Sequence, residues 1–183
     1  MPKDVILTLA RLNKEKDIVL RELHKLSLCD EKLEDVDVYL VPLAPEDALG
    51  YCEEDDGIHM PMVNIGRLKT LLGGSQVSFR DVLRHEYGHA FANTHRGLIR
   101  SKAFTETFGQ PYTRWDIEQK YDPEVHVSEY AATKSAEDFA ETFMYYVKHK
   151  GVIPKRWSGL PIHSKWLYIA DLATAIRDGR SRM

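Results

Sequence analysis

The stretch SFRDVLRHEYGHAFANTHRG, residues 78–97, decides which fold the sequence predicts. Ser78 with Asp81 three residues later is typical of a capping box, in which two side chains satisfy the first free N–H groups of a helix. Apolar residues then recur at helical spacing: Val82, Leu83, Tyr87, Ala90 and Phe91. Because Gly97 is typical of the end of a helix, we expect a helix over residues 78–96.

Two histidines four residues apart flank a glutamate in this helix, in the order His85-Glu86-Tyr87-Gly88-His89. Side chains at that spacing lie one turn apart on the same face, so both imidazoles can bind one metal ion, and neutral imidazole suits zinc. Glu86 would face a water at the open position of the metal and accept its proton. This arrangement is the HExxH signature of the zincins. We therefore expect one Zn²⁺ per chain, with His85 and His89 as ligands and Glu86 as the general base.

A catalytic zinc site needs a third protein ligand. Glu137 is favoured by its neighbour Glu141, because residues four apart share a helix face, and one carboxylate can bind the metal while the other orients a ligand histidine. Two alternatives remain open. His95 follows the second histidine at the metzincin spacing, although Ala92 stands where that motif has glycine. Cys52 resembles the upstream cysteine ligand of peptide deformylases, although the residues around it do not continue that motif.

With these residues, the chain resembles zincin metallopeptidases of the anthrax lethal factor type and related small zinc metallopeptidases. They share the HExxH helix and a second helix with ExxAE, and the resemblance covers residues Arg84 to Val147. It implies three zinc ligands: His85, His89 and Glu137. It also implies that Glu86 is the catalytic base and that Tyr130, seven residues before the third ligand, stabilises the oxyanion. Nothing in the chain resembles the receptor-binding or substrate-recruiting domains of that toxin, so no substrate is implied.

Tyr130 also makes chemical sense apart from the resemblance. A phenol that faces the metal would stabilise the negative charge that hydrolysis develops on the scissile oxygen. The alternative for Tyr130 is a buried aromatic residue with a satisfied hydroxyl. His126 is a second candidate donor, although a solvated loop histidine is the commoner case.

Helical patterns also flank this central region. Apolar spacing predicts one long or two short helices over residues 4–28, a second site helix over residues 135–150, and a C-terminal helix over residues 163–177. Ser135 with Asp138 three residues later is expected to begin the second site helix. The connection over residues 96–129 is long and rich in aromatic residues, so we expect it to form a lid or a pocket wall.

Strand patterns lie between the first helix and the HExxH helix, and we expect a small sheet over residues 35–66. Residues 35–43 alternate charged and apolar side chains, which predicts one strand. Residues 58–65 predict another, and Pro61 within it favours a position at the sheet edge. His59 in this strand is expected to face solvent or substrate. An edge strand can receive a peptide by main-chain hydrogen bonds.

Composition narrows the class of protein further. The 183 residues are 43% hydrophobic and 29% charged, which is typical of a globular chain. The 25 basic and 28 acidic side chains leave a net charge of −3 and no basic run, so nucleic acid is not expected as a partner. No apolar stretch approaches the roughly 18 residues of a membrane span, and the N-terminal apolar run is too short for a signal peptide. Cys29 and Cys52 are too few for a disulfide framework. We therefore expect no membrane association and a cytoplasmic location, with a non-classical export route left open.

Together these patterns predict one α+β, zincin-like domain over residues 1–183. The expected function is zinc-dependent hydrolysis of a peptide or protein substrate. Two alternatives are a catalytically silent zincin-fold binding or regulatory module and a metal-dependent amidase or deformylase that acts on a small substrate. The sequence predicts neither the substrate nor the oligomeric state.

Overall fold

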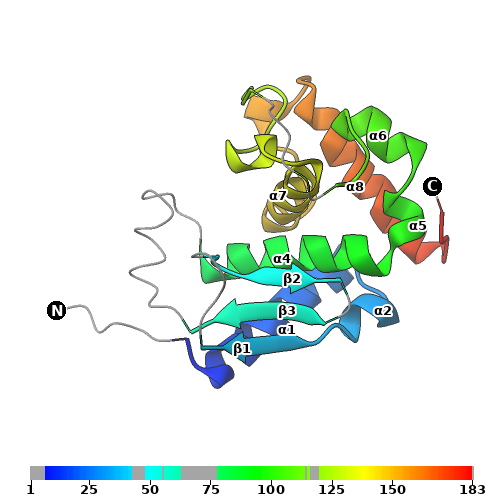
Figure 1. Ribbon diagram of the computed structural model, residues 1–183. Coiled ribbons are helices and arrows are strands. Elements are labelled where there is room, and N and C mark those ends of the chain that lie inside the picture. Colours follow the sequence, from blue (N-terminus) through cyan, green and yellow to red (C-terminus); the bar gives the residue numbers. More distant parts are fainter. Residues whose placement is uncertain are drawn as a thin grey trace.

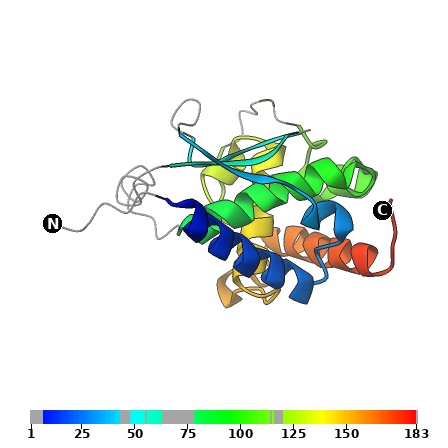
Figure 2. The same ribbon diagram turned by 90° about the horizontal axis from the view of Figure 1, so that it is seen from below.

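The computed structural model describes residues 7–42, 48–54, 56–62, 78–113, 115 and 120–182. These residues form a mixed fold of helices and one small three-stranded sheet, so the expected α+β class is confirmed at that level. The long helix α4 (Phe79–Thr94) lies between the sheet and helix α7 (Ser135–Lys148) (Figure 1). Helices α1 (Leu9–Lys25) and α4 cover the same face of the sheet (Figure 2).

The N-terminal region forms one long helix and one short one. Helix α1 begins at the cap residue Thr8, whose hydroxyl accepts a hydrogen bond from the Arg11 N–H at 3.3 Å. It ends before residue 28, and the short helix α2 (Glu31–Glu34) follows with Asp30 as its cap. Residues 4–6 of the expected helix lie outside the described residues. The buried face of α1 consists of Leu12, Val19 and Leu23, as the apolar spacing predicted.

The sheet corrects the prediction for the strand at residues 58–65. Strand β3 (Gly57–Pro61) lies at the centre, between β1 (Val38–Val41), which is parallel to it, and β2 (Tyr51–Glu53), which is antiparallel. The prediction of an edge position for this strand was therefore wrong. Pro61 fits there because it is the last residue of the strand, where a missing N–H costs the sheet little. The last residues of the predicted strand, 63–65, lie outside the described part of the chain.

Helix α4 begins as the sequence predicted and ends two residues before the expected end. Ser78 and Asp81 form the capping box, with the Asp81 N–H 3.2 Å from the Ser78 hydroxyl. The helix ends at Thr94, whose hydroxyl donates to the Ala90 carbonyl at 2.8 Å, and the next residue, His95, has left the helical conformation. The prediction that Gly97 stops this helix was wrong. Gly97 lies inside the short helix α5 (Arg96–Ile99), where its lack of a side chain lets the carbonyl of Ser181 approach.

Helix α7 begins at Ser135, the first residue of the predicted range 135–150, and ends two residues before the end of that range. Lys134 occupies the cap position, and Ser135 is the first helical residue rather than the cap. The Ser135 hydroxyl donates to the Pro111 carbonyl at 2.7 Å and accepts from the Thr113 N–H at 2.9 Å, so it ties the aromatic connection to the helix. The helix ends at Lys148, and Gly151 adopts φ +77° three residues later.

The rest of the described chain packs around α7. Helix α6 (Lys102–Phe108) and helix α8 (Ile162–Arg177) lie beside it, and short 3₁₀ turns η2 (Tyr130–Ala132) and η3 (Lys155–Trp157) connect the chain. Helix α8 therefore begins one residue earlier than predicted. In the described part of the chain, no helix is both long and apolar enough to cross a bilayer.

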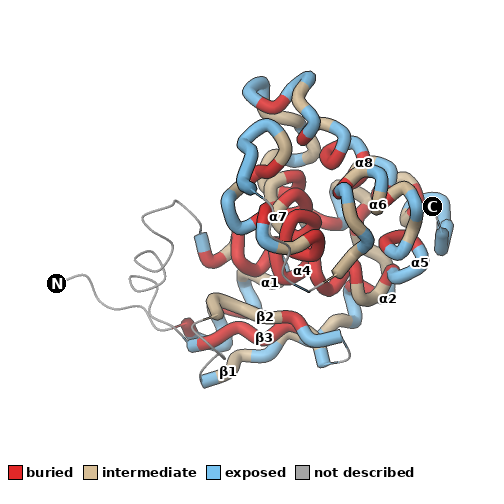
Figure 3. Tube along the Cα trace, turned by 45° about the horizontal axis from the view of Figure 1, so that its top comes forward, coloured by how far each residue is buried: buried red, intermediate tan, exposed pale blue. Residues whose placement is uncertain are grey.

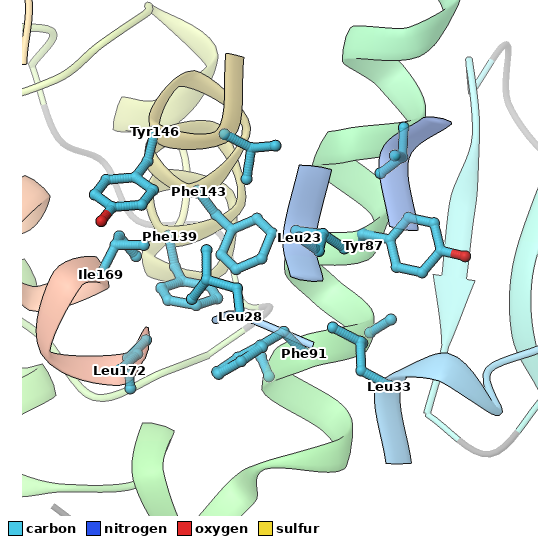
Figure 4. Packing of buried hydrophobic residues seen from close by; sticks show 14 of the residues in the cluster. Leu23, Leu28, Leu33, Tyr87, Phe91, Phe139, Phe143, Tyr146, Ile169 and Leu172 are labelled. Carbon is cyan, nitrogen blue, oxygen red and sulfur yellow. The ribbon is translucent and has the colours of Figure 1, made fainter. Parts of the chain in front are cut away.

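The core lies where α4 and α7 meet, and both helices are buried along most of their length (Figure 3). Phe139 and Phe143 point from α7 toward Phe91 of α4, with ring centroids 5.6–6.4 Å apart (Figure 4). Gly88 allows this close packing, because a Cβ atom at that position would lie only 3.0 Å from the Ala140 Cα. The two helices that carry the predicted metal ligands are therefore packed backbone against backbone.

Candidate metal centre

Helices α4 and α7 bring together three side chains that could hold a metal ion, and all three are buried: His85, His89 and Glu137. The Nε2 atoms of His85 and His89 lie 3.1 Å apart. The Oε2 atom of Glu137 lies 3.1 Å from His85 Nε2 and 3.2 Å from His89 Nε2. Three ligand atoms from two helices therefore converge on one point.

The spacing of these three atoms fits a metal ion. Ligand atoms about 2.0–2.2 Å from a tetrahedral zinc ion lie about 3.3–3.6 Å from each other. The observed triangle, with sides of 3.1–3.2 Å, is close to that separation. The donor set of two imidazoles and one carboxylate is also the set that catalytic zinc sites use when a fourth position stays open.

The charges of the centre favour a bound cation. Burial alone would lower the pKa of His85, but hydrogen bonds with Glu137 and Glu141 outweigh it and raise the pKa well above its ordinary value. Burial alone would raise the pKa of Glu137, but hydrogen bonds with His85 and His89 lower it far below its ordinary value. The carboxylates thus stabilise positive charge here, which a proton or a metal ion can supply.

Glu141 contacts the other ring nitrogen of His85, Nδ1, and not the Nε2 atom that faces His89 and Glu137. Its Oε1 lies 2.9 Å from His85 Nδ1, and its Oε2 accepts a hydrogen bond of 2.8 Å from the Ser128 hydroxyl. A carboxylate on Nδ1 keeps the proton there and leaves Nε2 free as a ligand. This is the geometry that an orienting role of Glu141 requires. Sequence reasoning missed Ser128, because nothing in its local pattern distinguishes it from other loop serines.

A second missed residue lies beside His89. The Tyr112 hydroxyl is 3.4 Å from His89 Nδ1, a long contact by hydrogen-bond standards. Tyr112 comes from the aromatic connection, which Ser135 fastens to the start of α7. Tyr112 therefore brings this part of the connection next to His89, and the lid or pocket wall expected for residues 96–129 stays a prediction. Residues 114 and 116–119 of the connection lie outside the described residues.

Glu86 is buried next to the centre without being one of the three converging ligands. Its Oε1 faces Gly50, just before strand β2, where a Cβ atom would lie 3.0 Å from that oxygen. The charge of Glu86 also acts on His85 and on Tyr130. Glu86 thus lies close to Gly50, and its charge acts on one of the two converging histidines.

Tyr130 lies in the 3₁₀ turn η2 and is 53% exposed, so it is not the buried aromatic residue of the alternative interpretation. Its ring centroid lies 5.9 Å from that of His85. Desolvation, the charges of Glu137 and Glu86, and a hydrogen bond with Glu137 raise the pKa of the Tyr130 hydroxyl well above its ordinary value. The hydroxyl therefore stays protonated and can donate a hydrogen bond at neutral pH.

The remaining candidates lie elsewhere. His95 caps the C-terminal end of α4, where its Nε2 bonds to Asp30 at 3.0 Å, and Cys52 lies on β2 with its thiol near Asn93. Neither belongs to the converging set found among the described residues. His126 is buried beside the ring of Tyr121, so it is not a solvated loop histidine.

His59 also departs from its prediction, because it is buried rather than open to solvent. Its ring stacks between Tyr39 and Tyr51, with centroids 5.1 and 4.7 Å away, across all three strands. The central position of β3 explains the burial, since both neighbouring strands present an aromatic side chain in the same row.

No family model, curated protein or solved structure matches the chain.

Proposed function

We propose that this protein is a zinc-dependent metallopeptidase with a zincin-like fold, similar to the lethal factor type. One observation carries the proposal: the HExxH pair His85 and His89 converges with Glu137 from a second helix, at distances of 3.1–3.2 Å. A purely structural zinc site is usually closed by four protein ligands, whereas this set has three among the described residues. An open position is what catalysis needs.

The chain's own residues have clear roles in this proposal. A zinc ion held by His85, His89 and Glu137 would supply Lewis acidity and lower the pKa of a bound water. Glu86 accepts the proton of the attacking water and passes it to the leaving amine. Tyr130 donates a hydrogen bond to the scissile oxygen as negative charge develops there. The half-exposed position of Tyr130 suits a group that meets substrate.

The substrate would pair with β2 instead of the strand that the sequence favoured. Strand β2 is an edge strand of the sheet, packs against α4, and begins next to Gly50, where a Cβ atom would meet the Glu86 side chain. An extended peptide can add to such an edge by main-chain hydrogen bonds. Its scissile bond would then lie between Glu86 and Tyr130.

The decisive experiment combines metal analysis with cleavage of a random peptide library. We expect about one zinc per chain in protein purified without chelators, and cleavage that chelation abolishes. Glu86→Gln should keep the fold and the metal but lose hydrolysis, because it removes the base and spares the ligands. Metal-loaded protein that cleaves no peptide would support the binding module, and cleavage of small amides alone would support the amidase.

A further inference from the structure

The Ser128 hydroxyl hydrogen-bonds both to Glu141, the partner of His85, and to the turn that carries Tyr130. Ser128 Oγ lies 2.8 Å from Glu141 Oε2, and the other oxygen of Glu141 lies 2.9 Å from Nδ1 of His85. The same Oγ lies 3.1 Å from the backbone nitrogen of Ala131, the residue after Tyr130. Ser128 is thus one hydrogen bond from the turn that presents Tyr130 and two from a predicted metal ligand.

The direction of each hydrogen bond follows from the chemistry of the groups. An ionised carboxylate only accepts, so the Ser128 hydroxyl must donate its one proton to Glu141. A backbone N–H only donates, so Ser128 must accept from Ala131. The hydroxyl therefore donates to Glu141 and accepts from Ala131 at the same time, and no other orientation of its proton keeps both hydrogen bonds. Hydrogen bonds linked in this way polarise and strengthen each other.

The turn needs such a constraint because Tyr130 itself is not held by burial. Its residue is 53% exposed, whereas the next two residues, Ala131 and Ala132, are buried. Five residues before Tyr130, the Val125 carbonyl accepts a hydrogen bond of 2.7 Å from Lys165 of α8, which anchors the chain that leads into the turn. These contacts fix the turn against the core, and the Ser128 hydroxyl links the turn to the metal centre as well.

We propose that Ser128 is a positioning residue that couples the Tyr130 turn to the orientation of His85. It does so by holding Glu141 on His85 Nδ1 while it accepts the Ala131 N–H. The catalytic consequence of this coupling rests on the proposed peptidase function, whereas the coupling itself does not.

The test uses three variants of the full chain. Ser128→Ala removes the hydroxyl, Ser128→Thr keeps it, and Thr133→Val is the matched control. Thr133 also bonds within the turn, but its hydroxyl donates to the Tyr130 carbonyl at 2.8 Å rather than to Glu141. The two readouts that need no activity are zinc affinity, by competition with a chromophoric chelator, and hydrogen exchange of the Ala131 amide.

We expect Ser128→Ala to weaken zinc binding about 5-fold, the value of one hydrogen bond, because Ser128 acts through Glu141 and does not itself contact a predicted ligand. It should also speed exchange of the Ala131 amide about 5- to 10-fold, the value of one hydrogen bond. Ser128→Thr should restore both, and Thr133→Val should leave zinc affinity unchanged. Unchanged zinc affinity or unchanged amide exchange in Ser128→Ala would overturn the proposal, as would equal loss of zinc affinity in Thr133→Val.

Kinetics add a separate readout. At saturating zinc, Ser128→Ala should lower kcat with little change in KM, and the same change should cost much less in a Tyr130→Phe background. Additive losses would contradict coupling through Tyr130. If the unaltered protein cleaves no peptide, the proposed function fails, and zinc affinity and amide exchange still decide the role of Ser128.

Discussion

Gly88→Ala tests how tightly the two ligand-bearing helices must pack. Two effects oppose each other in this variant. Alanine is a better helix former than glycine by about 1 kcal/mol in a helix interior. The new Cβ atom, however, would lie 3.0 Å from the Ala140 Cα and 3.3 Å from the Phe143 Cβ. Ordinary carbon–carbon separations are about 3.5–4.0 Å, so α4 and α7 must move apart by about 0.5–1 Å.

The steric effect should win. Overpacking a core costs about 1–3 kcal/mol, so we expect the variant to lose about 0–2 kcal/mol of stability after the helix-propensity gain. The metal centre should also be affected, because Glu137 moves away from His85 and His89, and functional sites tolerate only about 0.5 Å of displacement. Zinc affinity should therefore fall about 10-fold or more, which corresponds to about 1.4 kcal/mol.

Urea unfolding of the metal-free protein and a zinc competition titration measure the two quantities separately. The double variant Gly88→Ala/Ala140→Gly is the matched control. It removes the Ala140 Cβ atom, which the Cβ atom of Ala at position 88 would meet at 3.4 Å, but it leaves the clash with the Cα atom of residue 140 in place. The control should recover zinc affinity only in part. A Gly88→Ala protein that is about 1 kcal/mol more stable and binds zinc normally would refute the packing argument.

Three further outcomes follow from the structure. Glu137→Gln should weaken zinc binding far more than His95→Gln, because only Glu137 belongs to the converging set found among the described residues; the reverse order in a titration would favour the metzincin alternative. Burial alone would raise the pKa of Asp81, but hydrogen bonds and nearby cations lower it below its ordinary value. The ionised Asp81 carboxylate therefore stabilises the fold above the unfolded-state pKa, and this stabilisation is lost as the pH falls through the folded-state pKa. Asp81→Asn should lower the free energy of unfolding by about 1–3 kcal/mol at neutral pH and should remove the part of its decrease at low pH that comes from Asp81. Urea unfolding from pH 7 to 3 will show or contradict both effects. Tyr130→Phe should lower kcat about 10²- to 10³-fold and leave zinc affinity unchanged, and a fully active variant would show that this hydroxyl has no catalytic role.

Much of the candidate centre is local in sequence. A capping box and helical periodicity place residues 79–94 in one helix, and a spacing of four then puts His85 and His89 on one face. The same rule places Glu137 and Glu141 together on α7. These predictions needed no knowledge of the tertiary structure, because helix geometry alone relates residues three or four positions apart.

Contacts between distant segments had to come from the tertiary structure. Strand order is one example, because the sequence pattern of residues 58–61 suits a central strand as well as an edge strand. Strand β2, which pairs with the second edge of β3, has only three residues and is too short to predict. The role of Ser135 is another, since its hydroxyl bonds to Pro111 and Thr113 instead of capping the helix. Ser128 lies in an irregular segment whose conformation is set by what it packs against. The local sequence determined which atoms could bind a metal, and only long-range packing decided which side chains would orient them, because such contacts depend on pairings that no local periodicity encodes.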